Sequence, residues 1–133
     1  MSTDKKPYKI AIVEDDITIS QMYRMKFELE GHKVDVAHNG REGVELVKQV
    51  KPDIILLDIM MPEVDGVQCL KEIRKIDEFA QTPTLILTNL GQEEASPELQ
   101  KLAVEKYIIK SDTTPRQITE IVTDVLNNHP ALQ

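Results

Sequence analysis

The feature that most constrains this chain is a set of short aliphatic runs separated by longer amphipathic stretches. The runs cover residues 8–13, 33–37, 53–57, 84–87 and 107–109. Uninterrupted Ile, Leu and Val over four or so residues is typical of strands that are buried on both faces, as in a parallel sheet. The stretches between them carry apolar residues at helical spacing, and the clearest series is Ile118, Ile121, Val122, Val125 and Leu126. Strands and helices are therefore predicted to alternate along the whole chain.

Capping signals predict where these helices begin. Suitable side chains precede four of them: Asn39 with Glu42, Asp65 with Gln68, Ser96 with Pro97, and Thr114 with Pro115 and Gln117. Gly31 is expected to end the first helix, while Leu99, Leu102 and Ala103 are expected on the face of a short fourth helix. Parallel strands joined by helices need right-handed crossovers with helices on both faces. We expect an α/β fold with a doubly wound, flavodoxin-like (βα)5 sheet of order 2-1-3-4-5 and a ligand crevice at the carboxyl ends of strands 1 and 3.

Length and charge narrow the functional classes. A chain of 133 residues is predicted to form a single domain, with a core at about 8–127 and short tails at 1–7 and 128–133. Its net charge of −7 repels phosphate backbones, which argues against nucleic acid as a direct ligand. No apolar run is long enough for a signal peptide or a membrane span, and the single cysteine, Cys69, suits a reducing compartment. We therefore expect a cytoplasmic protein.

Ionisable and polar residues stand at the carboxyl ends of four predicted strands. Glu14, Asp15 and Asp16 follow strand 1, Asp58 follows strand 3, Thr88 strand 4 and Lys110 strand 5. Two like charges about 4 Å apart repel by roughly 4 kcal/mol at an effective dielectric constant near 20. Convergence of Asp15, Asp16 and Asp58 would therefore be costly without cations, which Lys110 and a divalent metal ion would supply. Oxygen-only ligands favour Mg²⁺ or Mn²⁺.

These residues belong to a wider set of motifs with a specific order and spacing. The set comprises Val13-Glu14-Asp15-Asp16, Leu57-Asp58-Ile59-Met60-Met61-Pro62 with Asp65-Gly66, Leu87-Thr88, and Tyr107-Ile108-Ile109-Lys110. On these motifs, and over nearly its full length, the chain resembles the receiver domain of bacterial two-component response regulators. The resemblance implies a signalling switch that is not an enzyme in its own right, although it assists its own phosphorylation and its slow dephosphorylation.

The resemblance also implies a role for each residue at the strand ends. Asp58 would accept a phosphoryl group from a histidine kinase, a phosphotransfer protein or a small phosphodonor. Asp16 and Asp58 would bind Mg²⁺ directly and Asp15 through water, and the Met60 backbone carbonyl would complete the ligands. Lys110 would pair with Asp58 and later with its phosphoryl oxygens. Phosphoryl transfer needs this combination of positioning and cations because negative charge is spread over the transition state.

Two further residues would carry the switch. The resemblance implies that the Thr88 hydroxyl moves toward the phosphoryl group and that Tyr107 turns inward behind it. The face formed by helix 4, strand 5 and helix 5 would then change and bind a downstream protein effector. Because only residues 127–133 follow the last helix core, the chain is expected to signal as a stand-alone receiver. A dimer that forms on phosphorylation stays open as a further partner.

The chain also departs from the receiver pattern. Ser111 follows Lys110 where receivers usually have a proline after a cis peptide bond, and a cis bond before a non-proline residue costs about 2.5–4 kcal/mol. Asn89 stands where a small residue commonly follows the threonine. The usual Gly-Ala turn ahead of strand 5 is replaced by residues 103–106, so we expect a differently built turn. Met60 and Leu90 are apolar at positions that in this family flank the hydrolytic water, which predicts slow self-dephosphorylation.

Two alternative functions stay open from the sequence. A phosphorylation-independent interaction module would have the same fold without a working pocket. A small Mg²⁺-dependent hydrolase of the haloacid-dehalogenase type would also use an aspartate nucleophile, but it needs a second aspartate where this chain has Met60. Phosphorylation of Asp58 separates the first alternative from a receiver, and a phosphatase assay tests the second.

Overall fold

Strands and helices alternate in the computed structural model, which describes residues 7–59, 66–88 and 101–128. The elements are β1 (Lys9–Val13), α1 (Ile17–Leu29), β2 (Lys33–Ala37), α2 (Gly40–Val50), β3 (Ile54–Asp58), α3 (Gly66–Arg74), the 3-10 helix η1 (Asp77–Phe79), β4 (Thr84–Thr88), β5 (Lys106–Ile109), the 3-10 helix η3 (Lys110–Asp112) and α5 (Pro115–Asn128). The predicted helix starts at Asp65 and at Ser96–Pro97 lie outside the described residues.

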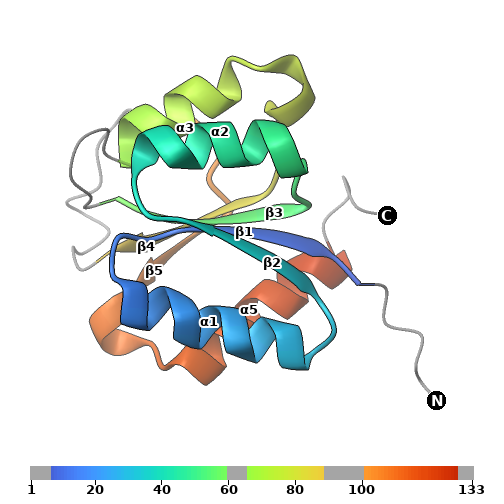
Figure 1. The fold of residues 1–133 in the computed structure, drawn as a ribbon, viewed down its shortest axis with the longest axis vertical. Helices are drawn as coiled ribbons and strands as arrows, with labels where there is room; N and C mark the ends of the chain where they lie inside the picture. Colours follow the sequence, from blue (N-terminus) through green and yellow to red (C-terminus); the bar gives the residue numbers. More distant parts are fainter. Residues whose placement is uncertain (1–6, 60–65, 89–100, 129–133) are drawn as a thin grey trace.

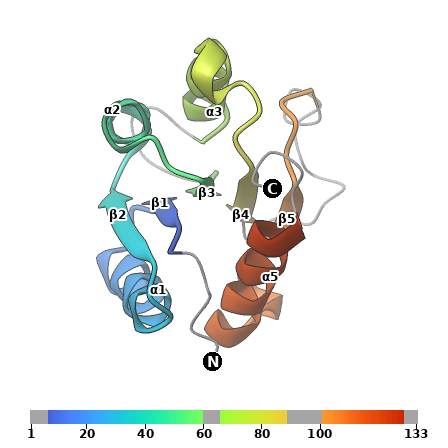
Figure 2. The same cartoon turned by 90° about the vertical axis from the view of Figure 1, so that its right-hand side faces the viewer.

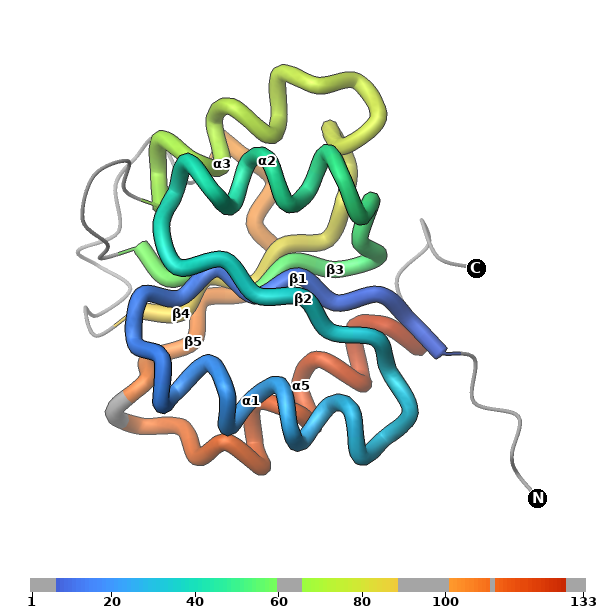
Figure 3. The backbone as a smooth tube through the Cα atoms, in the orientation of Figure 1, coloured from blue at the N-terminus to red at the C-terminus, as the bar shows by residue number. Residues whose placement is uncertain are grey.

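The five strands form one parallel sheet in the order β2-β1-β3-β4-β5, as predicted. Helices α1 and α5 cover one face, and α2 and α3 cover the other (Figures 1 and 2). All strands run toward the left in Figure 3, so their carboxyl ends share one edge of the sheet. The doubly wound fold is therefore confirmed, and the edge expected to hold the site exists.

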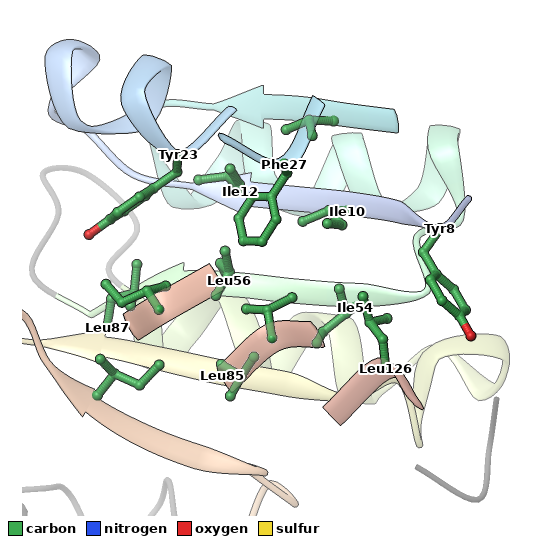
Figure 4. Close-up of a cluster of buried hydrophobic side chains, with 14 residues drawn as sticks. Tyr8, Ile10, Ile12, Tyr23, Phe27, Ile54, Leu56, Leu85, Leu87 and Leu126 are labelled. Carbon is green, nitrogen blue, oxygen red and sulfur yellow. The ribbon is translucent and has the colours of Figure 1, made fainter. Parts of the chain in front are cut away.

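Two apolar layers hold the helices on the sheet. The first lies between the sheet and the α1/α5 pair and includes Ile12, Phe27, Leu56, Leu85 and Leu126 (Figure 4). The second lies under α2 and α3. Strands β3 and β4 are buried along their whole length because both layers cover them. Burying one such aliphatic side chain contributes about 1.5–3 kcal/mol, which explains the unbroken aliphatic runs.

Capping residues begin the helices where the sequence predicted. The Glu42 backbone N–H donates to Asn39 Oδ1 at 2.8 Å at the start of α2. At the start of α5, the Thr114 N–H donates to Gln117 Oε1 at 2.8 Å and the Gln117 N–H donates to Thr114 Oγ1 at 3.1 Å. Gly31 follows α1 in the left-handed conformation, with φ +93°. None of the helices in the described ranges combines the length and apolar character needed to cross a bilayer.

The segment ahead of β5 differs from the prediction. Residues 101–103 form a turn, so Leu102 and Ala103 do not lie on a helix there. The left-handed conformation expected to be lost with the glycine is adopted by Ala103 itself, with φ +58°. A left-handed residue costs L-amino acids roughly 1–2 kcal/mol, so other contacts must hold this turn.

Candidate functional site

Strand register brings the chemistry-bearing residues to one level. Val13 pairs with Leu57, Asp58 with Leu87, and Thr88 with Ile109 across the β1, β3, β4 and β5 ladders. Glu14 and Asp15 follow β1, Asp58 and Thr88 end β3 and β4, and Lys110 follows β5. The residues predicted at the strand ends therefore share the carboxyl edge of the sheet.

Three carboxylates form the centre of the site. Glu14, Asp15 and Asp58 each offer an oxygen, and these oxygens lie within 4.8 Å of one another. Glu14 is fully buried and Asp58 is 3% exposed, whereas Asp15 is exposed. The cluster is thus sealed on the sheet side and reachable through Asp15. A cation entering from solvent would meet Asp15 first.

Lys110 supplies positive charge to this cluster from the end of β5. Its Nζ lies 2.7 Å from Glu14 Oε1 and 3.3 Å from Asp58 Oδ2. Burial alone would lower the pKa of Lys110, but the hydrogen bond from its ammonium to Glu14 and the charges of Asp58 and Glu14 outweigh this, so its pKa is raised. Lys110 therefore stays an ammonium at neutral pH, as a partner for an anion requires.

Burial raises the pKa of the Glu14 carboxyl to about 7, although hydrogen bonds from Lys110 and from the Asp16 backbone oppose this rise. The neighbouring Asp58 raises it further. Three carboxylates facing one ammonium carry an excess of two negative charges when all are ionised, which matches a divalent cation. The donor set is entirely oxygen, so the residues present fit Mg²⁺ or Mn²⁺.

The Asp16 side chain lies at the start of α1. Its Oδ1 accepts a hydrogen bond from the Ile19 backbone N–H at 2.9 Å and caps α1. Its backbone N–H donates to Glu14 Oε2 at 3.1 Å. The carboxylates that gather are Glu14, Asp15 and Asp58, so the acid placed in the cluster by the structure is Glu14 and not Asp16.

Sequence reasoning missed Glu14 although a signal was available. The residue directly before a predicted helix is a preferred N-cap position, which assigns Asp16 to α1. Glu14 directly follows β1 and continues the ladder, since its N–H donates to the Ala37 carbonyl at 3.0 Å. The first acid after the strand is therefore held by the sheet, and the last one by the helix.

Gly66 brings the start of α3 against the site. Its N–H donates to the Ile59 carbonyl at 3.0 Å. A Cβ at this position would lie 2.5 Å from the Asp58 carbonyl oxygen and 2.6 Å from Ile59 Cα. Only glycine permits this approach of two backbone segments, so Gly66 helps fix the segment that carries Asp58.

Thr88 and Tyr107 stand where the sequence placed them, on β4 and β5. Thr88 is buried at the end of its strand. The Tyr107 hydroxyl is buried with no hydrogen-bond partner among the described residues, and burial raises its pKa. Met60, Asn89 and Leu90 lie outside the described residues. The described peptide bonds, including Lys110–Ser111, are all trans, so Lys110 reaches Glu14 and Asp58 without a cis bond.

The chain is similar to known proteins over most of its length. The model of the response regulator receiver domain matches residues 10–123. The chain belongs to the response regulator receiver domain family. It is 32% identical over 118 residues to the chemotaxis protein CheY of Halobacterium salinarum, covering 89% of this chain and 96% of that protein.

Solved structures and longer regulators agree with this assignment. Chemotaxis protein CheY4 of Vibrio cholerae superposes with a TM-score of 0.83 at 26% identity, covering 91% of this receiver and all of that chain. The transcriptional regulatory protein TrcR of Mycobacterium tuberculosis is 39% identical over 85 residues, which are 64% of this receiver and 32% of that protein. The receiver thus spans about a third of the length of that regulator. Receivers are signalling modules of two-component systems, so the family resemblance and the response-regulator function class are confirmed.

Proposed function

We propose that this receiver is a phosphorylation-dependent switch in which Asp58 is the phosphoryl acceptor. The observation that carries the proposal is the position of Asp58, which ends β3 beside Glu14 and Asp15 and within 3.3 Å of Lys110 Nζ. An isolated buried carboxylate would be costly, whereas Asp58 faces an ammonium that compensates its charge. The cytoplasmic location expected from the sequence is part of this proposal.

The reaction forms one bond and breaks one. A carboxylate oxygen of Asp58 attacks phosphorus in a phosphohistidine or a small acyl phosphate; a P–O bond forms, and the P–N or P–O bond of the donor breaks. The leaving imidazole takes a proton from solvent. Lys110 Nζ, already beside Asp58, moves its hydrogen bond to a phosphoryl oxygen. A bound Mg²⁺ would neutralise charge on the transferring group.

Asp15 and Asp58 would hold the metal, with Glu14 as the third carboxylate of the cluster. Asp16 would act by capping α1 and by donating its backbone N–H to Glu14. The Met60 carbonyl remains the predicted backbone ligand. In this set Asp15 takes the direct-ligand role that the resemblance gave to Asp16, because the Asp16 carboxylate caps α1.

A helical surface of the donor protein would dock on α1. The face of α1 opposite its buried residues carries Met22, Met25 and Leu29, of which Met25 is 63% and Leu29 82% exposed. These positions are spaced i, i+3 and i+7, which suits packing against another helix. Ile17, 63% exposed, begins the same helix one residue beyond Asp16, beside the acidic cluster. A helix seated along α1 would therefore end close to Asp58.

The surface formed by β5 and α5 would bind the downstream effector. Tyr107 lies on β5, and its neighbour in that strand, Lys106, lines an open groove of about 520 Å³. The groove is lined by Lys106, Asp112, Thr113, Gln117, Glu120, Ile121 and Asp124. Movement of Thr88 and Tyr107 after phosphorylation would change this surface and bind a downstream effector. Dimerisation through the same face is the other outcome of that change.

The test is intact mass spectrometry after incubation with acetyl phosphate and Mg²⁺. We expect a gain of one phosphoryl group that disappears in Asp58→Asn and in the presence of a chelator. An unmodified protein under these conditions would favour the phosphorylation-independent module instead. Turnover of a chromogenic phosphate ester would favour the hydrolase.

A further inference from the structure

Arg74, the last residue of α3, directs its side chain into the protein at the end of the sheet opposite the acidic cluster. Its Nε donates to the Leu102 carbonyl at 2.8 Å, and its Nη2 donates to the Ala103 carbonyl at 3.2 Å. Nη1 donates to the Phe79 carbonyl at 2.8 Å, and Nη2 also to Thr84 Oγ1 at 3.1 Å. None of these acceptors carries a charge, so in these contacts Arg74 serves as a multiple hydrogen-bond donor.

These acceptors belong to three separate segments. Phe79 ends η1, Thr84 begins β4, and Leu102 and Ala103 form the turn that leads into β5. The guanidinium has its donors in a rigid planar fork, so satisfying several acceptors at once fixes their relative positions. Arg74 therefore ties the start of β4 to the turn ahead of β5.

The turn needs such a tie. Ala103 adopts the left-handed conformation, which a glycine would adopt at little cost. The two carbonyls that flank the Ala103 Cα, those of Leu102 and Ala103, are the ones that accept hydrogen bonds from Arg74. Its two hydrogen bonds to the turn offset the conformational cost that a glycine would have avoided.

Strand β5 depends on its neighbour on one side. It is only four residues long, lies at the edge of the sheet, and pairs with β4. A slip of one residue would move it by about 3.3 Å and turn its side chains to the other face. Lys110, which directly follows β5, would then lose its 2.7 Å contact with Glu14 and its 3.3 Å contact with Asp58.

We infer that Arg74 is a positioning residue for Lys110: by clamping the Ala103 turn to the start of β4, it sets the register of β5 and so places the ammonium beside Asp58. The inference rests on the proposed function, because the rate it affects is phosphorylation of Asp58. Arg74 does not touch the reacting groups; it acts through the position of the strand.

The test compares Arg74→Met with Arg74→Met/Ala103→Gly and with Ala103→Gly alone. At a temperature where circular dichroism shows each protein folded, Arg74→Met should be phosphorylated by acetyl phosphate roughly 10- to 100-fold more slowly at saturating Mg²⁺. Its Mg²⁺ dissociation constant should not rise, since the carboxylates lie at the ends of β1 and β3 and an ammonium that moves away from them can only favour cation binding. Ala103→Gly should restore most of the rate in the double variant and leave the otherwise unchanged protein at full rate.

Several outcomes would overturn the inference. A folded Arg74→Met at full rate would show that the β4 ladder alone positions β5, and an equal loss of Mg²⁺ affinity would indicate general disruption of the sheet. If Arg74→Met does not fold, Arg74→Lys, which keeps the charge without the fork, decides between the same outcomes. Failure of the unchanged protein to accept a phosphoryl group would instead contradict the proposed function.

Discussion

Lys110 Nζ lies between Glu14 Oε1, at 2.7 Å, and Asp58 Oδ2, at 3.3 Å, so one ammonium from the end of β5 joins acids that follow β1 and end β3. The contact spans 96 residues of sequence to Glu14 and 52 to Asp58. The contact therefore ties the end of β5 to the ends of β1 and β3, and it also places a positive charge beside the phosphoryl acceptor. Perturbing either acid should therefore alter stability and phosphorylation in separable ways.

The first prediction concerns pH and metal-free stability. Folded Glu14 keeps its proton up to about pH 7, whereas the unfolded carboxyl has its ordinary pKa of 4.5. The stability linked to this proton is therefore complete below about pH 4.5 and is lost as the pH rises through about 7. With a chelator present, raising the pH from 4.5 to 7.5 should cost the unchanged protein about 2–3 kcal/mol more in free energy of unfolding than it costs Glu14→Gln, which cannot titrate. Urea unfolding gives both profiles, and parallel profiles for the two proteins would contradict this.

A second prediction tests the close approach at Gly66. In Gly66→Ala the new Cβ would overlap the Asp58 carbonyl oxygen and Ile59 Cα, so the backbone must move. We expect a loss of about 1–3 kcal/mol in the free energy of unfolding and slower phosphorylation of the folded protein. Urea unfolding and the rate of phosphorylation by acetyl phosphate are the two measurements.

Gly31→Ala is the matched control for this change. Gly31 has φ +93°, and a Cβ added there would meet no other atom within 4 Å, so alanine costs backbone strain without touching the site. The change should lower stability by about 1 kcal/mol and leave the phosphorylation rate unchanged. Equal rates for both alanine variants would show that Gly66 does not position Asp58.

The strands were predictable because burial on both faces requires an unbroken run of aliphatic residues within the strand itself. The aliphatic runs of β3 and β4 are buried throughout, and the sheet order is that of a doubly wound fold with right-handed crossovers. Caps at Asn39 and Thr114 were likewise readable, because a capping bond joins residues three apart in the chain.

The details that escaped prediction depend on contacts between distant segments. Three consecutive acids follow β1, and composition alone does not say that the first stays on the sheet while the third caps α1. The Ala103 turn escaped for a similar reason. Its left-handed residue is held by Arg74, which is 29 residues earlier, and no local pattern contains that bond.

A third prediction separates phosphorylation from signalling at Thr88. Thr88→Ala should still accept a phosphoryl group at Asp58, because Lys110 and the carboxylates are unchanged. One charge-assisted hydrogen bond contributes about 1.5–3 kcal/mol, so partner binding by the phosphorylated form should weaken roughly 10- to 100-fold. A complete shift from 1:99 to 99:1 needs about 5.5 kcal/mol, which is more than one such bond supplies. Calorimetric titration of the phosphorylated variant with its effector is the measurement, and unchanged affinity would contradict the role of Thr88.

The apolar face of α1 gives a fourth prediction. The single variants Met25→Lys and Leu29→Lys each place one charge on this face. Each should reduce phosphotransfer from the cognate kinase at least about tenfold in kcat/KM, because the charge disrupts helix packing outside the pocket. Phosphorylation by acetyl phosphate should be unchanged, because these side chains are exposed and do not reach Asp58. Gln49→Lys, at an exposed position of α2, is the control of equal charge. Equal transfer to all of these proteins would place the donor on another face.

The last prediction concerns the lifetime of the phosphorylated state. Met60 and Leu90, two residues beyond Asp58 and Thr88, are apolar at positions that in receivers flank the hydrolytic water. Neither side chain can hold a water molecule by hydrogen bonds, so loss of the phosphoryl group should be slow. Introducing Met60→Asn with Leu90→Glu supplies an amide and a carboxylate that can orient water, and should speed the loss roughly tenfold or more. Phosphate release from purified phosphoprotein gives the rates. Met60→Leu with Leu90→Met keeps both positions apolar and should not change the lifetime, and the same slow rate in the polar variant would show that these positions do not control hydrolysis.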